Sequence, residues 1–248
     1  MKFAFKFGKR EHLQALLNGN IRFMSLQYYK DFKSTTGKSG IGDNEEARIL
    51  FNEHTKAVMY CKELSDEPVA YGQLNTVDMN ISLNKPIFSC LIIKEKQMIR
   101  KRFDNSGTFS YKLSKSIKTN LKKDFHESDS VLFIVHFEEF LKRIHEKLKS
   151  MELSAISGEI KYDNSPEKGW GKLLDIINQP IEEQLKSLCY SKVSHFSHQQ
   201  EHRILIYNKE LSNHSEPFYL DIDPINDIAF IIDKASFFGG DIEFHYRY

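Results

Sequence analysis

The first 26 residues constrain the fold most, because they read as a complete strand–helix–strand unit. Aromatic side chains alternate with smaller or charged ones over Phe3–Phe7, which predicts a strand with an aromatic inner face. Residues 10–18 predict a short helix with leucines inward, and Gly19 follows where a C-terminal cap belongs. Residues 20–26 then predict a second strand. The chain therefore begins with both kinds of secondary structure.

The rest of the chain continues this mixed pattern. We expect strands near Arg48–Asn52, Lys56–Cys61, Pro86–Ile93, Val131–His136, Gly158–Tyr162, Glu201–Tyr207, Phe218–Ile222, Ile228–Ile232 and Ile242–Tyr246. We expect helices at Ser114–Asp124, Phe137–Met151, Glu167–Asn178 and Ile181–Tyr190. This predicts an α+β fold with a mixed, mostly antiparallel sheet and flanking helices. A single domain over 1–248 would comprise the opening unit (1–30), a helical middle (112–190) and C-terminal strands (199–248).

Composition narrows the class of protein. Hydrophobic residues make up 40% of the 248 residues and aromatic residues 12%, which favours a packed core over disorder. The net charge of +1 points to no particular partner. Three scattered cysteines give no disulfide framework and favour a reducing compartment. With no signal-like start and no bilayer-length apolar run, we expect a cytoplasmic protein without a membrane partner.

A dense polar cluster, residues 195–200, stands directly before the apolar strand at 201–207. On a strand, Gln199, Glu201 and Arg203 would share one face. Such a row is costly to bury alone, so it is solvated, internally paired, or the lining of a site. Glu201 is suited to accept sugar hydroxyls and to stabilise positive charge at an anomeric carbon, and Arg203 to hold a phosphate or orient Glu201. The plainer alternative is a Glu201–Arg203 surface pair on an edge strand.

Four residues of metal-ligating type lie within the same region: Cys189, His195, His198 and His202. His198 and His202 would share a face only on a helix, whereas the apolar run that follows predicts a strand. No CxxC motif occurs anywhere in the chain. We therefore expect no metal, and the imidazoles could instead bind phosphates or carry protons.

Two further stretches are candidates for ligand contact. Residues 94–123 carry ten Lys and Arg against two acidic residues, with aromatics interleaved, which suits a nucleic-acid backbone or a solvated helix face. The glycine-rich loop Thr35–Asn44 lacks the spacing of a phosphate-binding loop and predicts either a flexible connection or a lid.

Several motifs together resemble one family. The opening contains Phe5-Lys6-Phe7-Gly8-Lys9 and then Leu16-Leu17-Asn18-Gly19-Asn20-Ile21-Arg22-Phe23-Met24-Ser25-Leu26. Lys161-Tyr162-Asp163 follows, and later Lys192, Phe196 and Gln200-Glu201-His202-Arg203-Ile204. In order and spacing these resemble domain of unknown function family 2971 and relatives described as abortive phage-infection proteins. The organisation is also similar to that of the ADP-ribosyltransferase superfamily.

The resemblance implies roles for particular residues. Glu201 would be the catalytic glutamate that binds the nicotinamide-ribose 2′-hydroxyl of NAD, and Gln199 would position the acceptor. The contacts to NAD would come from Lys6 on the first strand, Arg22 or Ser25 on the second, and Tyr28 or Tyr29 stacking on nicotinamide. The sequence departs from the family where Gln199 replaces an acidic residue and His202 an aromatic one. The superfamily's usual first-strand Arg or His is also not evident.

These observations lead to one leading expectation and two alternatives. The resemblance implies a defence- or toxin-associated enzyme that cleaves NAD and modifies a nucleic acid held by residues 94–123. The first alternative is a non-catalytic sensor or antitoxin that binds a partner protein and keeps Glu201 and Arg203 as a structural pair. The second is a nuclease or RNA-binding toxin that uses His195, His198 and the lysines.

Overall fold

The structure is a computed structural model that describes residues 2–29, 31, 48–50, 56–60, 68–73, 76–78, 84–94, 98–103, 108–162, 178–192 and 194–239. Three predicted segments lie outside these residues: the glycine-rich loop at 35–44, all but the last residue of the helix at 167–178, and the strand at 242–246.

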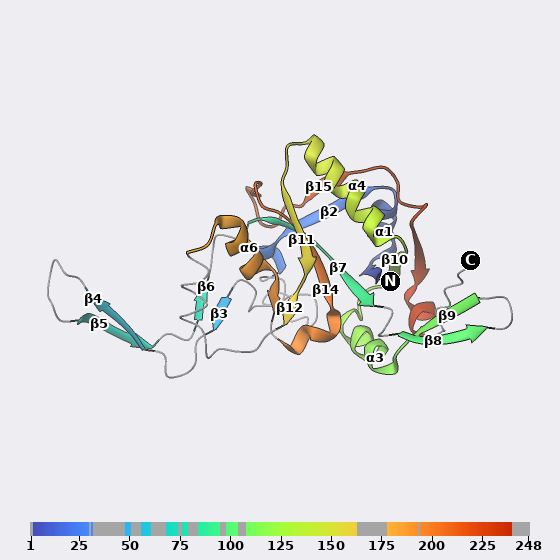
Figure 1. The fold of residues 1–248 in the computed structure, drawn as a ribbon, viewed down its shortest axis with the longest axis horizontal. Helices are drawn as coiled ribbons and strands as arrows, with labels where there is room; N and C mark the ends of the chain where they lie inside the picture. Colours follow the sequence, from blue (N-terminus) through green and yellow to red (C-terminus); the bar gives the residue numbers. More distant parts are fainter. Residues whose placement is uncertain are drawn as a thin grey trace.

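The centre of the fold is an antiparallel sheet in the order β11-β14-β7-β1-β10-β16 (Figure 1). Strand β2 pairs with β7, and β15 pairs with β2. The bounds are β1 Lys2–Gly8, β2 Asn20–Ser25, β7 Pro86–Lys94, β10 Ser130–Ile134, β11 Ala155–Glu159, β14 Glu201–Ile206, β15 Phe218–Asp221 and β16 Ala229–Asp233. The expected α+β class with a mostly antiparallel sheet is thereby confirmed.

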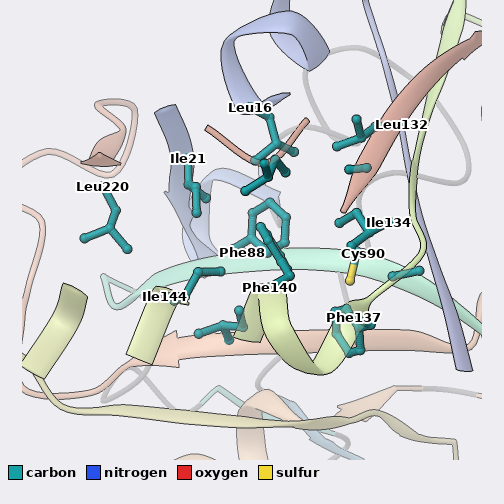
Figure 2. Packing of buried hydrophobic residues seen from close by; sticks show 14 of the residues in the cluster. Leu16, Ile21, Phe88, Cys90, Leu132, Ile134, Phe137, Phe140, Ile144 and Leu220 are labelled. Carbon is teal, nitrogen blue, oxygen red and sulfur yellow. The ribbon is translucent and has the colours of Figure 1, made fainter. Parts of the chain in front are cut away.

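Helices cover both faces of this sheet. The helices are α1 Arg10–Leu17, α3 Lys115–Asp124, α4 Phe137–Ser150, α6 Ile181–Cys189 and α7 Lys234–Gly239, with a 3₁₀ helix, η4, at Ser194–Gln199. On one face, Phe140 and Ile144 of α4 pack with Phe88 of β7 and Leu16 of α1 (Figure 2). On the opposite face the phenylalanines of β1 pack with α3 and α7. Within the described residues, no helix is both long enough and apolar enough to cross a bilayer.

Short two-stranded ladders complete the described structure. They are β3 Arg48–Leu50 with β6 Thr76–Asp78, β4 Lys56–Tyr60 with β5 Pro68–Gln73, β8 Met98–Phe103 with β9 Thr108–Leu113, and β12 Lys161–Tyr162 with β13 Ser191–Lys192. The β4–β5 and β8–β9 hairpins lie at opposite ends of the molecule (Figure 1). The basic segment 94–123 is thus split between the β8–β9 hairpin and α3, and is not a single helix face.

Gly19 shows why the opening unit turns where it does. Its φ of +93° lies in the left-handed region, and a Cβ there would meet the carbonyl oxygen of Ile222 at 2.1 Å. The turn from α1 into β2 therefore requires glycine, as the sequence predicts. The second strand ends one residue earlier than expected, at Ser25, and residues 26–29 are helical.

Strand β7 has a gap along one of its edges. Its later residues pair with β1, from Leu91 opposite Phe5 onward, and its first two pair with β2, Ile87 opposite Met24. β14 occupies the other edge continuously from Ile87 to Leu91. Among the described strand pairings, residues 88–90 therefore have a partner on one edge only, because β1 and β2 diverge there.

Candidate active site

Glu201, the first residue of β14, is a buried carboxylate held by two cations. Arg203 donates from Nε to Oε1 at 2.6 Å, and Lys192 lies with Nζ 2.8 Å from Oε2. Glu201 is 8% exposed and Arg203 only 2%. β14 lies inside the sheet between β11 and β7, so the alternative of a solvated pair on an edge strand is wrong.

The charges around Glu201 favour its ionised form. Burial by itself raises the pKa of a carboxyl, but Arg203 and Lys192 outweigh it and hold the pKa of Glu201 well below its usual range. Each carboxylate oxygen has two lone pairs. The contacts of the described residues place one cationic donor on Oε1 and two on Oε2, so Oε1 retains capacity to accept another hydrogen bond.

The surroundings fix both members of the Glu201–Arg203 pair. Arg203 also donates from Nη1 to the carbonyl of Cys189 at 2.7 Å, which ties β14 to the end of α6. The backbone N–H of Glu201 donates to the hydroxyl oxygen of Tyr162 at 2.8 Å. Burial raises the pKa of Tyr162 to about 12, so this hydroxyl stays neutral at ordinary pH.

Lys6 enters the same region from the far end of the chain. Its ammonium reaches the gap in the edge of β7, donates to the carbonyl of Ser89, and lies 4.8 Å from the centroid of the Phe88 ring. The side chain thereby satisfies a strand carbonyl that β1 and β2 leave behind as they diverge. Burial lowers the pKa of Lys6, against the opposing influence of Cys90 and Glu201.

These groups line a small cavity of about 80 Å³. Its charged and polar lining comes from β1, β7, β14, β13 and the residues beside them: Lys6, Tyr29, Ser89, Lys192, Gln199, Glu201 and Arg203. Its three cations face one carboxylate, so among the described residues the lining carries an excess of positive charge. A cavity of this size holds a few waters or one small chemical group, not a whole ligand.

A larger groove of about 610 Å³ adjoins the small cavity. Lys6, Phe7, Tyr29 and Phe125 line both spaces, so the two lie next to each other. The polar lining of the groove includes Lys9, His12, Arg22 and Tyr28, with Glu127 as an acidic residue. Its volume falls within the range of small-molecule and cofactor sites, and the cations suit an anionic ligand.

Most of the predicted ligand contacts converge here. Arg22 and Tyr28 line the groove, and Tyr29 lines both spaces, where burial raises its pKa to about 12. Ser25 is the exception, since it is absent from the described linings of both spaces. Its hydroxyl donates to the carbonyl of His214 and accepts from the Tyr28 N–H, which makes it a structural residue of the turn after β2.

Gln199 reaches the cavity by a different route from the one predicted. It ends η4 and is not on the strand, and Gln200, with φ +46°, separates it from β14. The expectation that Gln199 shares a strand face with Glu201 and Arg203 is therefore wrong. Gln199 still lines the cavity, and its Nε2 donates to Oδ2 of Asp124 on α3 at 2.9 Å.

His198 and His202 have different partners. His198 contacts Asp124 through Nε2, whereas His202 lies on the opposite face of β14 with Nε2 2.8 Å from the Ser157 hydroxyl. Burial lowers the pKa of His202 to about 4. Within the part of the chain that the structure describes, no group of three His, Cys, Asp or Glu is arranged to hold a metal ion.

Three residues that contact Glu201 or Gln199 have no role in the sequence-based prediction: Lys192, Tyr162 and Asp124. Lys192 and Tyr162 belong to the motifs that carry the family resemblance, and this signal could have found them. Asp124 ends the predicted helix at 114–124 and carries no distinguishing pattern.

Comparisons with protein-family models, with curated proteins and with solved structures return no match. The functional argument therefore rests on the geometry of this chain.

Proposed function

We propose that this protein is an ADP-ribosyltransferase-like enzyme that cleaves the bond between nicotinamide and ribose in NAD. One observation carries the proposal: Glu201 lines a small cavity that shares four lining residues with a neighbouring cationic, aromatic groove of cofactor size. Lys6 and Arg22 from the start of the chain and Lys192 and Arg203 from its later part line these two neighbouring spaces. The wider role we propose is that of a bacterial toxin or phage-defence component acting in the cytoplasm.

In this proposal each residue has a defined task. Oε1 of Glu201 accepts the ribose 2′-hydroxyl, and its negative charge stabilises the positive charge that develops at the anomeric carbon. Lys6 and Arg22 contact the phosphates, and Tyr28 or Tyr29 stacks on nicotinamide. Arg203 keeps Glu201 ionised and in place, while Gln199 lies at the cavity wall toward the acceptor.

A nucleic acid is the acceptor we propose. Three lysines of α3, Lys115, Lys122 and Lys123, are exposed, and Phe125, directly after α3, lines both the cavity and the groove. Lysines so placed would hold a phosphate backbone next to the site.

The test is release of nicotinamide from NAD by wild-type protein and by E201Q. We expect release with wild type and at least a hundredfold less with E201Q, since a neutral amide cannot stabilise the developing charge. Release of labelled nicotinamide from NAD is then followed with single-stranded DNA, RNA and protein mixtures as acceptors. The class of acceptor that accelerates release is thereby identified. Absence of release with every acceptor would refute the enzyme proposal.

A second candidate is a non-catalytic binding module, which the double pairing of Glu201 favours. A carboxylate engaged by Arg203 and Lys192 is also what a purely structural pair looks like. E201Q lowers the stability of the protein under either candidate, so the distinguishing result for the binding module is that NAD produces no thermal shift in wild type.

A further inference from the structure

Two facing residues on a two-residue ladder converge on the same residue, Glu201. Strands β12 and β13 pair in parallel over two residues each, with Tyr162 directly opposite Lys192. Tyr162 accepts the backbone N–H of Glu201 through its hydroxyl, and Lys192 contacts the Glu201 side chain through Nζ. The facing residues Tyr162 and Lys192 therefore contact both the backbone and the side chain of Glu201.

The two cations approach Glu201 from different elements. Arg203 comes from β14 itself, two residues further along, and takes Oε1 at 2.6 Å with a longer contact of 3.4 Å to Oε2. Lys192 comes from β13 and takes Oε2 at 2.8 Å. The two shortest contacts fall on different oxygens and so fix the plane of the carboxylate. Oε1 has one cationic partner among the described residues and Oε2 has two, so Oε1 can accept one more hydrogen bond.

Lys192 has little freedom to leave this position. Its side chain is only 4% exposed, and Nζ lies 5.3 Å from the centroid of the Phe196 ring. An exposed lysine side chain samples many rotamers. The buried side chain of Lys192 is held in one, and its ammonium therefore has a fixed position in the lining of the cavity.

We propose that Lys192 and Tyr162 are positioning residues of the Glu201 site. Lys192 fixes the charge and the rotation of the Glu201 carboxylate, and Tyr162 fixes the position of the Glu201 backbone. This role rests on the proposed function, because it concerns the residue that would act on the ribose. Both residues act through Glu201, which they hold by its side chain and by its backbone N–H.

The experiment compares K192M, K192R and Y162F with wild type, and K161M serves as a matched control. Lys161 lies on the same ladder but is exposed, so its loss removes a lysine without touching Glu201. Nicotinamide release is measured as kcat and KM against pH. In parallel, the side-chain carboxyl of Glu201 is titrated by ¹³C NMR, with E201Q used for assignment.

Each variant has its own expected signature. K192M removes one of two cations, so the acid limb of kcat and the Glu201 titration both move up by about 1–3 pH units. K192R restores both to the wild-type position. Y162F removes an acceptor that is neutral, so kcat falls about tenfold through misplacement, with unchanged KM and no shift of the acid limb. K161M matches wild type throughout.

The two proposals fail in different ways. If wild type releases no nicotinamide, the proposed enzyme fails, but the NMR titration still reads the effect of Lys192 on Glu201. An unshifted titration in folded K192M overturns the assignment of Lys192, and an unchanged kcat in Y162F overturns that of Tyr162. Should K192M not fold, as judged by circular dichroism, K192Q is titrated in its place under the same criteria.

Discussion

Arg203 donates to both carboxylate oxygens of Glu201, from Nε to Oε1 at 2.6 Å and from Nη2 to Oε2 at 3.4 Å, within a single strand. Side chains two residues apart share a face of a strand, so this contact needs no tertiary structure to bring the pair together. Lys192 is the partner that only the folded chain supplies.

Replacing Glu201 by glutamine should destabilise the protein strongly. The substitution leaves Arg203 and Lys192 buried without a counter-charge, and breaking a buried pair in this way costs about 3–5 kcal/mol. Urea unfolding at pH 7 measures the loss. Glu159 provides the control, because it also lies between two lysines, Lys2 at 3.0 Å and Lys94 at 2.7 Å, but is half-exposed. E159Q should cost less than about 1 kcal/mol.

The contribution of the Glu201 ion pairs to stability should be visible as a difference between wild type and E201Q that depends on pH. The pKa of Glu201 is lower in the folded than in the unfolded chain, where the usual value is 4.5. Its contribution to the free energy of unfolding is therefore complete above about pH 4.5 and is lost as pH falls below that value. Urea unfolding of wild type and E201Q between pH 3 and pH 7 should show the two curves converging at the acidic end. Curves that stay parallel would contradict the depressed pKa.

His202 should make the stability of the protein depend on pH in a second range, at higher pH than the range set by Glu201. The pKa of His202 is about 4 in the folded chain and 6.5 in the unfolded chain. Between these two pH values the unfolded chain therefore binds a proton at His202 and the folded chain does not. Stability should fall by roughly 3 kcal/mol as pH drops from 6.5 to 4. H202Q should flatten this part of the profile, whereas substitution of the exposed His12 by glutamine should leave it unchanged.

Gly19 should not tolerate a side chain. Alanine would have to hold φ near +93° and place its Cβ 2.1 Å from the carbonyl oxygen of Ile222, so the backbone must shift. We expect G19A to lose at least about 1–3 kcal/mol, measured by thermal unfolding. G239A is the matched control, since a Cβ there meets nothing within 4 Å, and its melting temperature should match that of wild type.

Phe140 should be a major anchor of α4 on the sheet. It is completely buried and packs against Phe88 of β7 at a centroid distance of 5.9 Å (Figure 2). F140A should cost about 3–5 kcal/mol in the free energy of unfolding, measured in urea. F230A removes the same ring from a 42% exposed position and should cost much less; equal losses would argue against this account of the core.

The elements best predicted from sequence are those whose pattern is local and strongly periodic. The alternation over Phe3–Phe7 and the apolar stripe of residues 137–151 give β1 and α4 almost to the residue. The β8–β9 hairpin was missed because its first strand, Met98–Phe103, is rich in Lys and Arg and reads as a charged surface. Strand pairing there overrides the sequence pattern.

The site was predictable only in part, for a different reason. Glu201 and Arg203 follow from spacing on one strand, but Gln199 does not, because Gln200 leaves the extended region with φ +46°. Lys192 and Tyr162 lie on strands of two residues, which are too short to produce any periodicity. Asp124 approaches Gln199 only through the packing of α3 on η4, which no local pattern encodes.

The order of strands in the sheet has a consequence for synthesis of the protein. β7 is flanked by β1 from the start of the chain and by β14, which begins at Glu201. During translation β7 therefore waits for its neighbour β14, which is made much later, since domains fold as units once their distant contacts are available. The cavity around Glu201 therefore does not exist on the ribosome until β14 has emerged, so the site is among the last parts of the fold to form.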